Sequence, residues 1–248
     1  MKIIILVKFS GEEKREEYNP AIWARYLSKK YDLNAEIICI SMDNLTVIPK
    51  LKKFFDYNVQ KVYLLNDLYF AGADTLATSA TIARAIQLLE PDYNLILTNA
   101  ISSNGETGHV PIQVSANLNI PFGCNVIDVC YEEGRWSCIQ DYGYYLEKIV
   151  INASEKLLLS INLSLNNDVK FLGQPTLFDL YKNQKNIEII DNNFLQISKN
   201  RCGYKGARTI VKEAVELTNC HKNKKVVIKA TNELKTYLNK LVLEHYEV

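Results

Sequence analysis

The chain has 248 residues, a composition that is 48% hydrophobic and 23% charged, and a formal net charge of +1. Such values are ordinary for a soluble globular protein with a full core, and they exclude a protein that is held to nucleic acid or to a membrane surface by its overall charge. Since no apolar run reaches the roughly 18 residues that span a bilayer, the sequence also predicts a protein without a membrane span.

The beginning of the chain and its cysteines indicate a cytoplasmic protein. Residues 1–9 carry a short apolar run without a small-residue cleavage site, which is typical of a first strand rather than a signal peptide. The six cysteines form no Cys-x-x-Cys pair, and Cys39, Cys124 and Cys130 lie in apolar stretches, where a thiol behaves as a small hydrophobic group. The three histidines show no ligand-like spacing, so no metal site is expected.

Apolar strands and amphipathic helices alternate strictly over about the first 130 residues. Asn19-Pro20 is typical of a helix start, with Asn as the cap and Pro in the first turn, and Asp74 and Thr75 stand at the cap position of a later helix. In chain order the expected elements are: strand 2–8, a helix from 19, strand 35–41, helix 45–57, strand 61–65, a helix from 74, a strand from 95, a helix from about 106 to 118, and strand 121–129. This alternation predicts an α/β fold with a doubly wound parallel sheet and helices on both faces.

A doubly wound sheet binds its ligand beyond the carboxyl ends of its strands, where the strand order reverses. The segments expected to line such a site are 6–9, 41–42, 66–69 and 98–106. The last of these is a loop of small and polar residues that opens a helix at about 106–108, and such a helix start presents backbone N–H groups to a phosphate. Ordinary capping, without any ligand, explains the Asp74 and Thr75 pattern equally well.

The pattern changes after Glu133. Three segments are expected to be antiparallel strands that extend the sheet or cover its edge: 135–140, 142–152 and 156–163. Residues 166–174 are expected to form a loop and 176–185 a short helix, whereas CGYKGART at 202–209 has no expected element of its own. Residues 232–246 show the amphipathic pattern of a terminal helix, which packs either on a partner or on its own domain.

Five short motifs stand in a fixed order along the chain. They are a Val-Lys pair that ends the first strand, an Asn-Pro helix start, FAGADTLATS, an Ala-Ile pair followed by Gly-Glu-Thr and Gly-His-Val, and CGYKGART: residues 7–8, 19–20, 70–79, 100–110 and 202–209. In this order they resemble the beta subunit family of the electron transfer flavoproteins, notably its electron-bifurcating and nitrogen-fixation-associated branches.

The resemblance implies a Rossmann-like, adenine-nucleotide-binding domain in a heterodimer with an electron transfer flavoprotein alpha subunit. It implies a redox-active FAD mainly in the alpha subunit, at the interface, and an AMP or a second FAD in this chain. The chain would be a non-catalytic electron carrier subunit that exchanges electrons with a flavin-dependent dehydrogenase or another redox partner. A loop that docks such partners falls at about 166–182, with Phe171 or Leu172 as anchors unless they pack beneath the loop.

The candidate cofactor-binding residues come from the expected carboxyl edge of the sheet and from the family's motifs: Leu6, Val7, Lys8, Asn19, Pro20, Met42, Asp74, Thr75, Thr78, Asn99, Ala100, Ile101, Asn104, Gly105, Glu106, Thr107, Gly108, His109 and Val110. Residues 1–185 are expected to form the nucleotide-binding domain, with the antiparallel extension from about 134, and 186–248 a C-terminal arm whose terminal helix packs on the partner subunit. His109 stands where the family often has Gln, and both AMP and FAD remain open.

Two other functions stay open at this point. One is a nucleotide-binding module related by fold alone, either a stress-protein-like domain or an adenylating enzyme. An adenylating enzyme needs a phosphate-gripping loop directly after the first strand, and residues 9–12 are only faintly similar to one. The other is a structural subunit that has lost its nucleotide.

Overall fold

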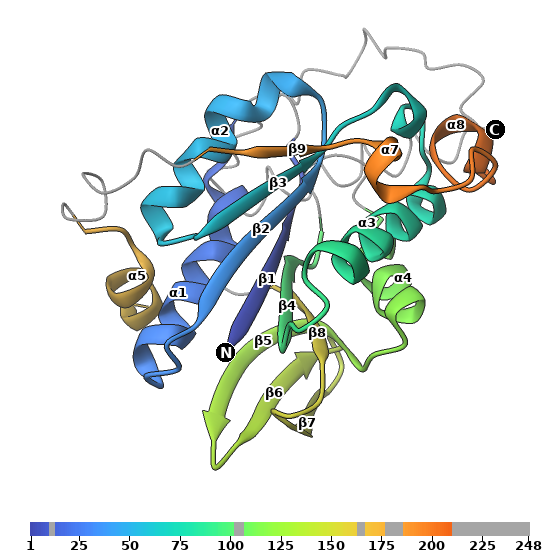
Figure 1. Ribbon diagram of the computed structural model, residues 1–248. Coiled ribbons are helices and arrows are strands. Elements are labelled where there is room, and N and C mark those ends of the chain that lie inside the picture. Colours follow the sequence, from blue (N-terminus) through green and yellow to red (C-terminus); the bar gives the residue numbers. More distant parts are fainter. Residues whose placement is uncertain (10–12, 102–106, 163–166, 177–185, 210–248) are drawn as a thin grey trace, which may run out of the picture. The chain divides into compact units, whose positions relative to one another are not determined.

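A computed structural model describes residues 1–9, 13–101, 107–162, 167–176 and 186–209 (Figure 1). The chain divides into two compact units, Met1–Ile210 and Val211–Val248, and the described residues all belong to the first. The strands are β1 Lys2–Val7, β2 Glu36–Met42, β3 Lys61–Leu65, β4 Leu95–Asn99, β5 Phe122–Glu132, β6 Arg135–Asp141, β7 Leu146–Asn152, β8 Leu157–Ile161 and β9 Glu188–Ile190. The helices and short 3-10 helices are η1 Arg15–Tyr18, α1 Asn19–Lys30, η2 Leu45–Val47, α2 Ile48–Lys52, η3 Lys53–Tyr57, η4 Leu68–Phe70, α3 Thr75–Leu89, α4 His109–Leu118, α5 Asn167–Gly173, α7 Asn192–Leu195 and α8 Gly203–Gly206.

The strands form one sheet in the order β7-β6-β5-β8-β4-β1-β2-β3-β9. From β5 to β9 every neighbouring pair is parallel, and β6 and β7 add to β5 as antiparallel strands. The chain runs outward from β1 through β2 to β3 and then returns to β4 on the other side of β1. The predicted doubly wound α/β sheet is confirmed, and its strand order reverses between β1 and β4.

Each face of the sheet buries its own layer of side chains. Because successive strand residues point to opposite faces, Ile3 and Ile5 of β1 join the core that contains Trp23 of α1, whereas Ile4 joins the core that contains Ile82 of α3. Figure 1 shows α1 and α2 on one side of the sheet and α3 and α4 on the other. A central strand buried on both faces is therefore expected to be apolar along its buried part, as β1 is from Ile3 to Val7.

The prediction that residues 156–163 form an antiparallel strand is wrong. Leu157–Ile161 is β8, which lies in the middle of the sheet and pairs in parallel with both β4 and β5. All five of its residues are buried, as expected for a strand covered on both faces. The chain therefore leaves the sheet as the β6–β7 hairpin and returns to its centre. The antiparallel strands predicted at 135–140 and 142–152 are confirmed as β6 and β7, except that β7 begins at Leu146 and residues 142–145 form the turn before it.

Three smaller predictions also need correction. The single helix expected over 45–57 is divided into η2, α2 and η3. The loop expected at 166–174 contains α5, whose Gly173 lies so close to α1 that an added Cβ would be 2.6 Å from the Ile22 carbonyl oxygen. The segment 202–209 contains α8. Two expected helices lie outside the described residues: the one over 176–185, of which only Thr176 is described, and the one over 232–246.

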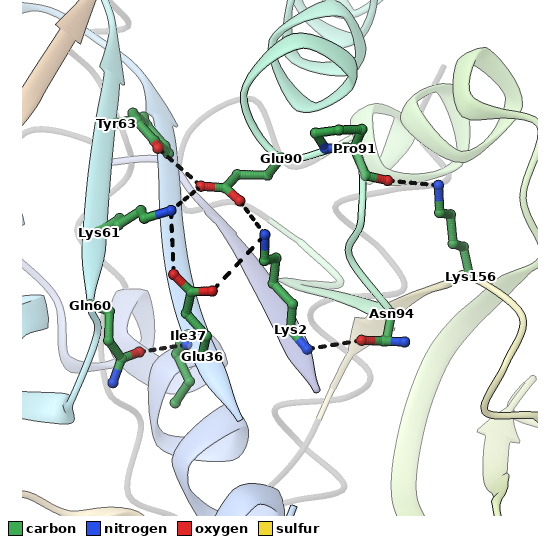
Figure 2. A network of polar contacts seen from close by, with 10 residues as sticks. All are labelled: Lys2, Glu36, Ile37, Gln60, Lys61, Tyr63, Glu90, Pro91, Asn94 and Lys156. Carbon is green, nitrogen blue, oxygen red and sulfur yellow. Dashed lines mark hydrogen bonds and ion pairs between the residues drawn. The ribbon is translucent and has the colours of Figure 1, made fainter. Parts of the chain in front are cut away.

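A network of ion pairs fixes the amino ends of the parallel strands (Figure 2). The Glu90 carboxylate, at the end of α3, is 2% exposed and lies 2.6 Å from the Lys2 ammonium and 2.8 Å from that of Lys61. The Tyr63 hydroxyl donates to it at 3.0 Å, and Glu36 bridges the two lysines from β2. Burial alone would raise the pKa of Glu90, but the hydrogen bonds from Lys2, Lys61 and Tyr63 outweigh burial and lower it.

Candidate functional site

The ends of neighbouring parallel strands meet at the carboxyl edge of the sheet. In the register between β1 and β4, Leu6 lies opposite Thr98, and Met42 ends β2 on the other side of β1. Leu6 is buried and Val7 packs against the core on the α1 side. A ligand at this edge would therefore meet both residues mainly through their backbone.

The start of α1 reaches the same edge through a hydrogen bond from Asn99. The Asn99 Nδ2 group donates to the Glu16 carbonyl oxygen at 2.9 Å, which ties the end of β4 to η1, directly before α1. The predicted cap at Asn19 is wrong by one residue, because Tyr18 is the cap and Asn19 is already helical, with Pro20 in the first turn. Asn19 and Pro20 thus begin the helix that Asn99 joins to β4.

Asp43, which the sequence analysis did not identify, holds the ends of three strands together. Its side chain is 7% exposed and lies 3.5 Å from the Lys8 ammonium, and it accepts a hydrogen bond from the Phe9 N–H at 3.2 Å. Its carbonyl oxygen accepts from Asn66 Nδ2 at 2.8 Å. The feature of the sequence that could have identified Asp43 is its position directly after the second strand. Lys8 remains 47% exposed despite this ion pair, so its charge can still attract an anion.

The start of α4 contacts the end of β4. Gly108 caps this ten-residue helix with φ +62°, and an added Cβ would lie 3.1 Å from the Ala100 carbonyl oxygen. Gly108 has no side chain to cap the helix, and the His109 N–H donates instead to the Thr107 hydroxyl at 3.5 Å. The positive end of the helix dipole lies at this end of α4. Thr107 and His109 are exposed beside it. The structure brings together Ala100 with residues 107–110, whereas Ile101 is exposed and Asn104, Gly105 and Glu106 lie outside the described residues.

Asp74 is a helix cap, as the capping interpretation predicts. Its Oδ1 atom accepts from the Ala77 N–H at 2.9 Å. Its Oδ2 atom accepts from the N–H groups of Arg208 at 2.7 Å and Thr209 at 3.1 Å, and from the Thr209 hydroxyl at 3.3 Å. Four accepted hydrogen bonds fill the usual capacity of a carboxylate, so a ligand at Asp74 would have to displace them.

The other two predicted residues of this helix start have hydrogen-bond partners in α4 and in α3 itself. The Thr75 hydroxyl accepts from Gln113 Nε2 at 3.3 Å, which joins α3 to α4. The Thr78 N–H donates to the Asp74 carbonyl oxygen at 2.9 Å, in the first turn of α3. The candidates thus belong to two sets of elements, the ends of β1, β2 and β4 and the start of α3, and the Thr75–Gln113 hydrogen bond links the second set to α4.

Two sequence motifs that are distant in the chain are in contact. The Tyr204 N–H donates to the Ala71 carbonyl oxygen at 2.8 Å. Gly203 has φ +56°, and an added Cβ would lie 2.0 Å from the Tyr69 carbonyl oxygen. FAGADTLATS and CGYKGART therefore form one structural unit. The two glycines of CGYKGART were the signal in the sequence for such a close approach.

A separate hollow of about 380 Å³ lies beside η1 and η3. Its lining residues are Glu13, Arg15, Tyr18, Lys53, Asp56, Tyr57 and Pro175. The rings of Tyr18 and Tyr57 stack with their centroids 5.6 Å apart, and Glu13 forms an ion pair with Lys53 at 2.8 Å. None of these lining residues is a predicted cofactor-binding residue, although the Tyr18 ring packs against Phe9, directly after β1, with the centroids 6.1 Å apart.

Across the described part of the chain, no helix is long and apolar enough to cross a membrane. The same residues contain no group of three or more His, Cys, Asp or Glu side chains placed to hold a metal ion.

Comparison with known proteins gives a match to a family model described as "Electron transfer flavoprotein domain", over residues 23–168. A protein of Thermoanaerobacterium thermosaccharolyticum named "Electron transfer flavoprotein subunit beta" is 28% identical over 182 residues, which are 72% of this chain and 66% of that protein. The chain therefore spans about two thirds of the length of that relative.

Two further relatives are matched over more of their length. "Caffeyl-CoA reductase-Etf complex subunit CarD" of Acetobacterium woodii is 27% identical over 77% of this chain and 71% of its own length. "Electron transfer flavoprotein subunit beta" of Clostridium acetobutylicum is 26% identical over 88% of this chain and 81% of its own length.

Proposed function

Because the chain belongs to the electron transfer flavoprotein family, with relatives that are beta subunits, we propose that it is the nucleotide-holding beta subunit of a heterodimeric electron carrier. Its partners would be an alpha subunit that carries the redox-active FAD and a flavin-dependent dehydrogenase or another redox protein. The nucleotide in this chain would be AMP or a second FAD.

The observation that carries the proposal is the meeting of β1, β4, α1 and α4 at the point where the strand order reverses. A phosphate would fit the start of α4, because Gly108 leaves no side chain over its first turn and the hydrogen bond from the His109 N–H to the Thr107 hydroxyl is long, at 3.5 Å. The Lys8 ammonium supplies positive charge at the same edge of the sheet, and the exposed Thr107 hydroxyl is a further donor. The residues present therefore fit a nucleotide phosphate.

A bound flavin would supply the one- and two-electron chemistry. The chain itself would bind and orient the nucleotide, and no bond-breaking step is assigned to it. Asp43 would hold Lys8 and the end of β1 in place, and Asn99 would hold the start of α1, so that the site is formed before the nucleotide arrives.

We further propose a nucleotide-binding domain at 1–185 and a C-terminal arm at 186–248 that contacts the alpha subunit. The described part of this arm supplies β9, α7 and α8 to the first unit. A docking role for the segment near 166–182 is supported by Phe171, which is 83% exposed, whereas Leu172 packs against the core.

We place the protein in the cytoplasm because five of its cysteines are free thiols, among them the buried Cys39 and Cys138.

The experiment is to co-express the chain with its neighbouring alpha-like subunit, purify and denature the complex, and quantify the released FAD and AMP. One FAD and one AMP per heterodimer would support a carrier with one flavin, and two FAD without AMP would assign a second flavin to this chain. No complex and no nucleotide would contradict the proposal, and a colourless chain that binds ATP would favour the module related by fold alone.

A further inference from the structure

The sheet ends in two edge strands of different length, β7 and β9, which lie at its opposite ends (Figure 1). β9 has three residues, and so short an edge offers little backbone to another chain. β7 has seven residues in regular register with β6, without a bulge or a proline. In the described part of the chain no strand pairs with its outer edge. Apart from the charged residues Glu147 and Lys148, β7 therefore lacks the usual protection of an edge strand against pairing.

The hydrogen bonds at the two ends of the hairpin show which backbone groups of β7 point outward. The Tyr142 N–H donates to the Tyr145 carbonyl oxygen at 3.1 Å, and the Ala153 N–H donates to the Gly134 carbonyl oxygen at 2.8 Å. Because hydrogen-bonded pairs alternate along an antiparallel ladder, the odd-numbered residues of β7 bond to β6. The N–H and C=O groups of the even-numbered residues point away from β6: Leu146, Lys148, Val150 and Asn152.

The outward-pointing residues also carry exposed side chains. Leu146 is 61% exposed and Val150 is 53% exposed. Lys148 lies between them and is exposed, without an ion pair to any described residue. Ile149 and Ile151, which alternate with these residues, pack against the core instead. The edge of β7 thus presents two apolar side chains and one positive charge on the face that is turned away from the core.

The turn before β7 adds aromatic surface to this edge. The rings of Tyr142 and Tyr145 stack with their centroids 5.0 Å apart, and Tyr144 is fully exposed. Tyrosine is enriched in the buried parts of protein interfaces. A long edge strand with this much exposed apolar surface is an aggregation hazard in a chain that stays alone. These features favour a permanent partner over a transient one.

Charge determines what kind of strand fits the edge. If two copies of this chain paired through β7 about a two-fold axis, the register centred on Lys148 would oppose two ammonium groups and the register centred on Glu147 two carboxylates. The register centred on Ile149 would set Lys148 against Val150. A strand of a different protein has none of these conflicts if it carries a carboxylate opposite Lys148 and apolar side chains opposite Leu146 and Val150.

We propose that the outer edge of β7 accepts a strand of the alpha-like partner subunit, so that the sheet continues across the heterodimer. The added strand would carry an acidic residue between two apolar residues at alternate positions, in the pattern apolar-x-acid-x-apolar. Main-chain hydrogen bonds would supply the affinity and this side-chain pattern the specificity. The inference deepens the proposed function and rests on it for the identity of the partner.

Amide hydrogen exchange of the co-expressed heterodimer, resolved by residue, tests the pairing. We expect the amides of Leu146, Lys148 and Val150 to exchange about as slowly as those of Glu147 and Ile149, which bond to β6. Fast exchange at the three outward amides, beside slow exchange at the two inward ones, is the behaviour of an open edge and would overturn the proposal.

Val150→Pro removes one outward N–H group without removing a hydrogen bond to β6. We expect the dissociation constant of the two subunits to rise about tenfold, while slow exchange at Ile149 and Ile151 shows that the hairpin remains intact. Val150→Thr is the matched control, because it keeps the N–H group and the β-branched shape, and it should leave the dissociation constant unchanged. A dissociation constant in Val150→Pro equal to that of the wild type would contradict the pairing.

A charge reversal tests the side-chain pattern. Lys148→Glu should raise the dissociation constant about tenfold, because two carboxylates would face each other, and the effect should shrink at high salt. Lys52→Glu is the matched control, since it makes the same change of charge at an exposed position of α2 and should have no effect. An unchanged dissociation constant in Lys148→Glu, or an equal rise in Lys52→Glu, would speak against the proposed strand.

These measurements separate the inference from the proposed function. Nucleotide content should be unchanged in the β7 variants, because β7 lies at the end of the sheet and the proposed nucleotide site at β1 and β4. A heterodimer with slow exchange at the edge but without nucleotide would contradict the proposed function alone, and one with nucleotide but an open edge would contradict this inference alone. A complex whose mass shows two copies of this chain, with protection that is lost on dilution, would assign the edge to a second copy and overturn the proposal.

Discussion

Gly108 is the residue on which the position of the start of α4 depends. Its φ of +62° is unfavourable for residues with a Cβ, and an added Cβ would lie 3.1 Å from the Ala100 carbonyl oxygen. We predict that Gly108→Ala lowers the free energy of unfolding by about 1–2 kcal/mol and weakens AMP binding about tenfold, because the first N–H groups of α4 must shift. Urea unfolding and AMP titration of the purified complex measure the two effects.

Gly134 in the β5–β6 turn provides the control for this variant. It has φ +74° with no atom within 4 Å of an added Cβ, so Gly134→Ala introduces the same backbone strain far from the strand ends. A similar loss of stability with unchanged AMP affinity is expected. If Gly134→Ala weakened AMP binding as much as Gly108→Ala, the effect on binding would come from general destabilisation.

Single residues also show which contacts can be predicted from a local sequence pattern and which cannot. The cap at Asp74 could be predicted because capping involves the next few residues of the same helix. The hydrogen bonds to Arg208 and Thr209 could not, because no local pattern records a contact 134 residues away. The role of Asp43 was missed for the same reason, since its partners come from the ends of β1 and β3.

Among the elements, the amino ends of β1, β2 and β3 depend on Glu90 (Figure 2). We predict that Glu90→Gln lowers the free energy of unfolding by about 2–4 kcal/mol, because Lys2 and Lys61 lose a carboxylate that is 2% exposed. Glu36 is 37% exposed, so Glu36→Gln should cost less than about 1 kcal/mol. Equal losses in the two variants, measured by urea unfolding, would contradict this account of the network.

The same carboxylate predicts a dependence on pH. The pKa of Glu90 is lowered from its ordinary value of 4.5 by Lys2, Lys61 and Tyr63, which outweigh burial. A group with a lowered folded-state pKa contributes stability that is fully present above the unfolded value and is lost as the pH falls through the folded value. The stability difference between wild type and Glu90→Gln should therefore be constant near neutral pH and shrink below about pH 4.5. A difference that grows on acidification would disprove the assignment.

Strand type could be predicted from the sequence more easily than strand order. The apolar run of β1 and the alternation of strands with helices were sufficient for the parallel part. The run of β8 is also mainly apolar, apart from Ser160, but it follows the change of pattern after Glu133, from which an antiparallel strand was predicted. Its complete burial between β4 and β5 is a property of the sheet as a whole, which short-range patterns do not contain.

At the scale of the whole molecule, the order of the motifs was more informative than any one of them. Alternation alone predicts a sheet whose order reverses, and therefore the edge at which a ligand would lie. It does not predict that Asn99 reaches Glu16 or that the start of α3 is joined to residues 208–209 rather than to the strand ends. The predicted site residues consequently divide into two groups, of which the one at the ends of β1, β2 and β4 forms the proposed site.

The most direct test of the central claim is amide hydrogen exchange of the purified heterodimer, stripped of nucleotide and then reloaded with AMP. The account predicts slower exchange on loading at residues 7–9 and 107–110, with the region around Asp74 unchanged. Protection confined to the hollow beside η1 and η3, or protection at Asp74 without any at 107–110, would contradict a nucleotide site at the reversal between β1 and β4.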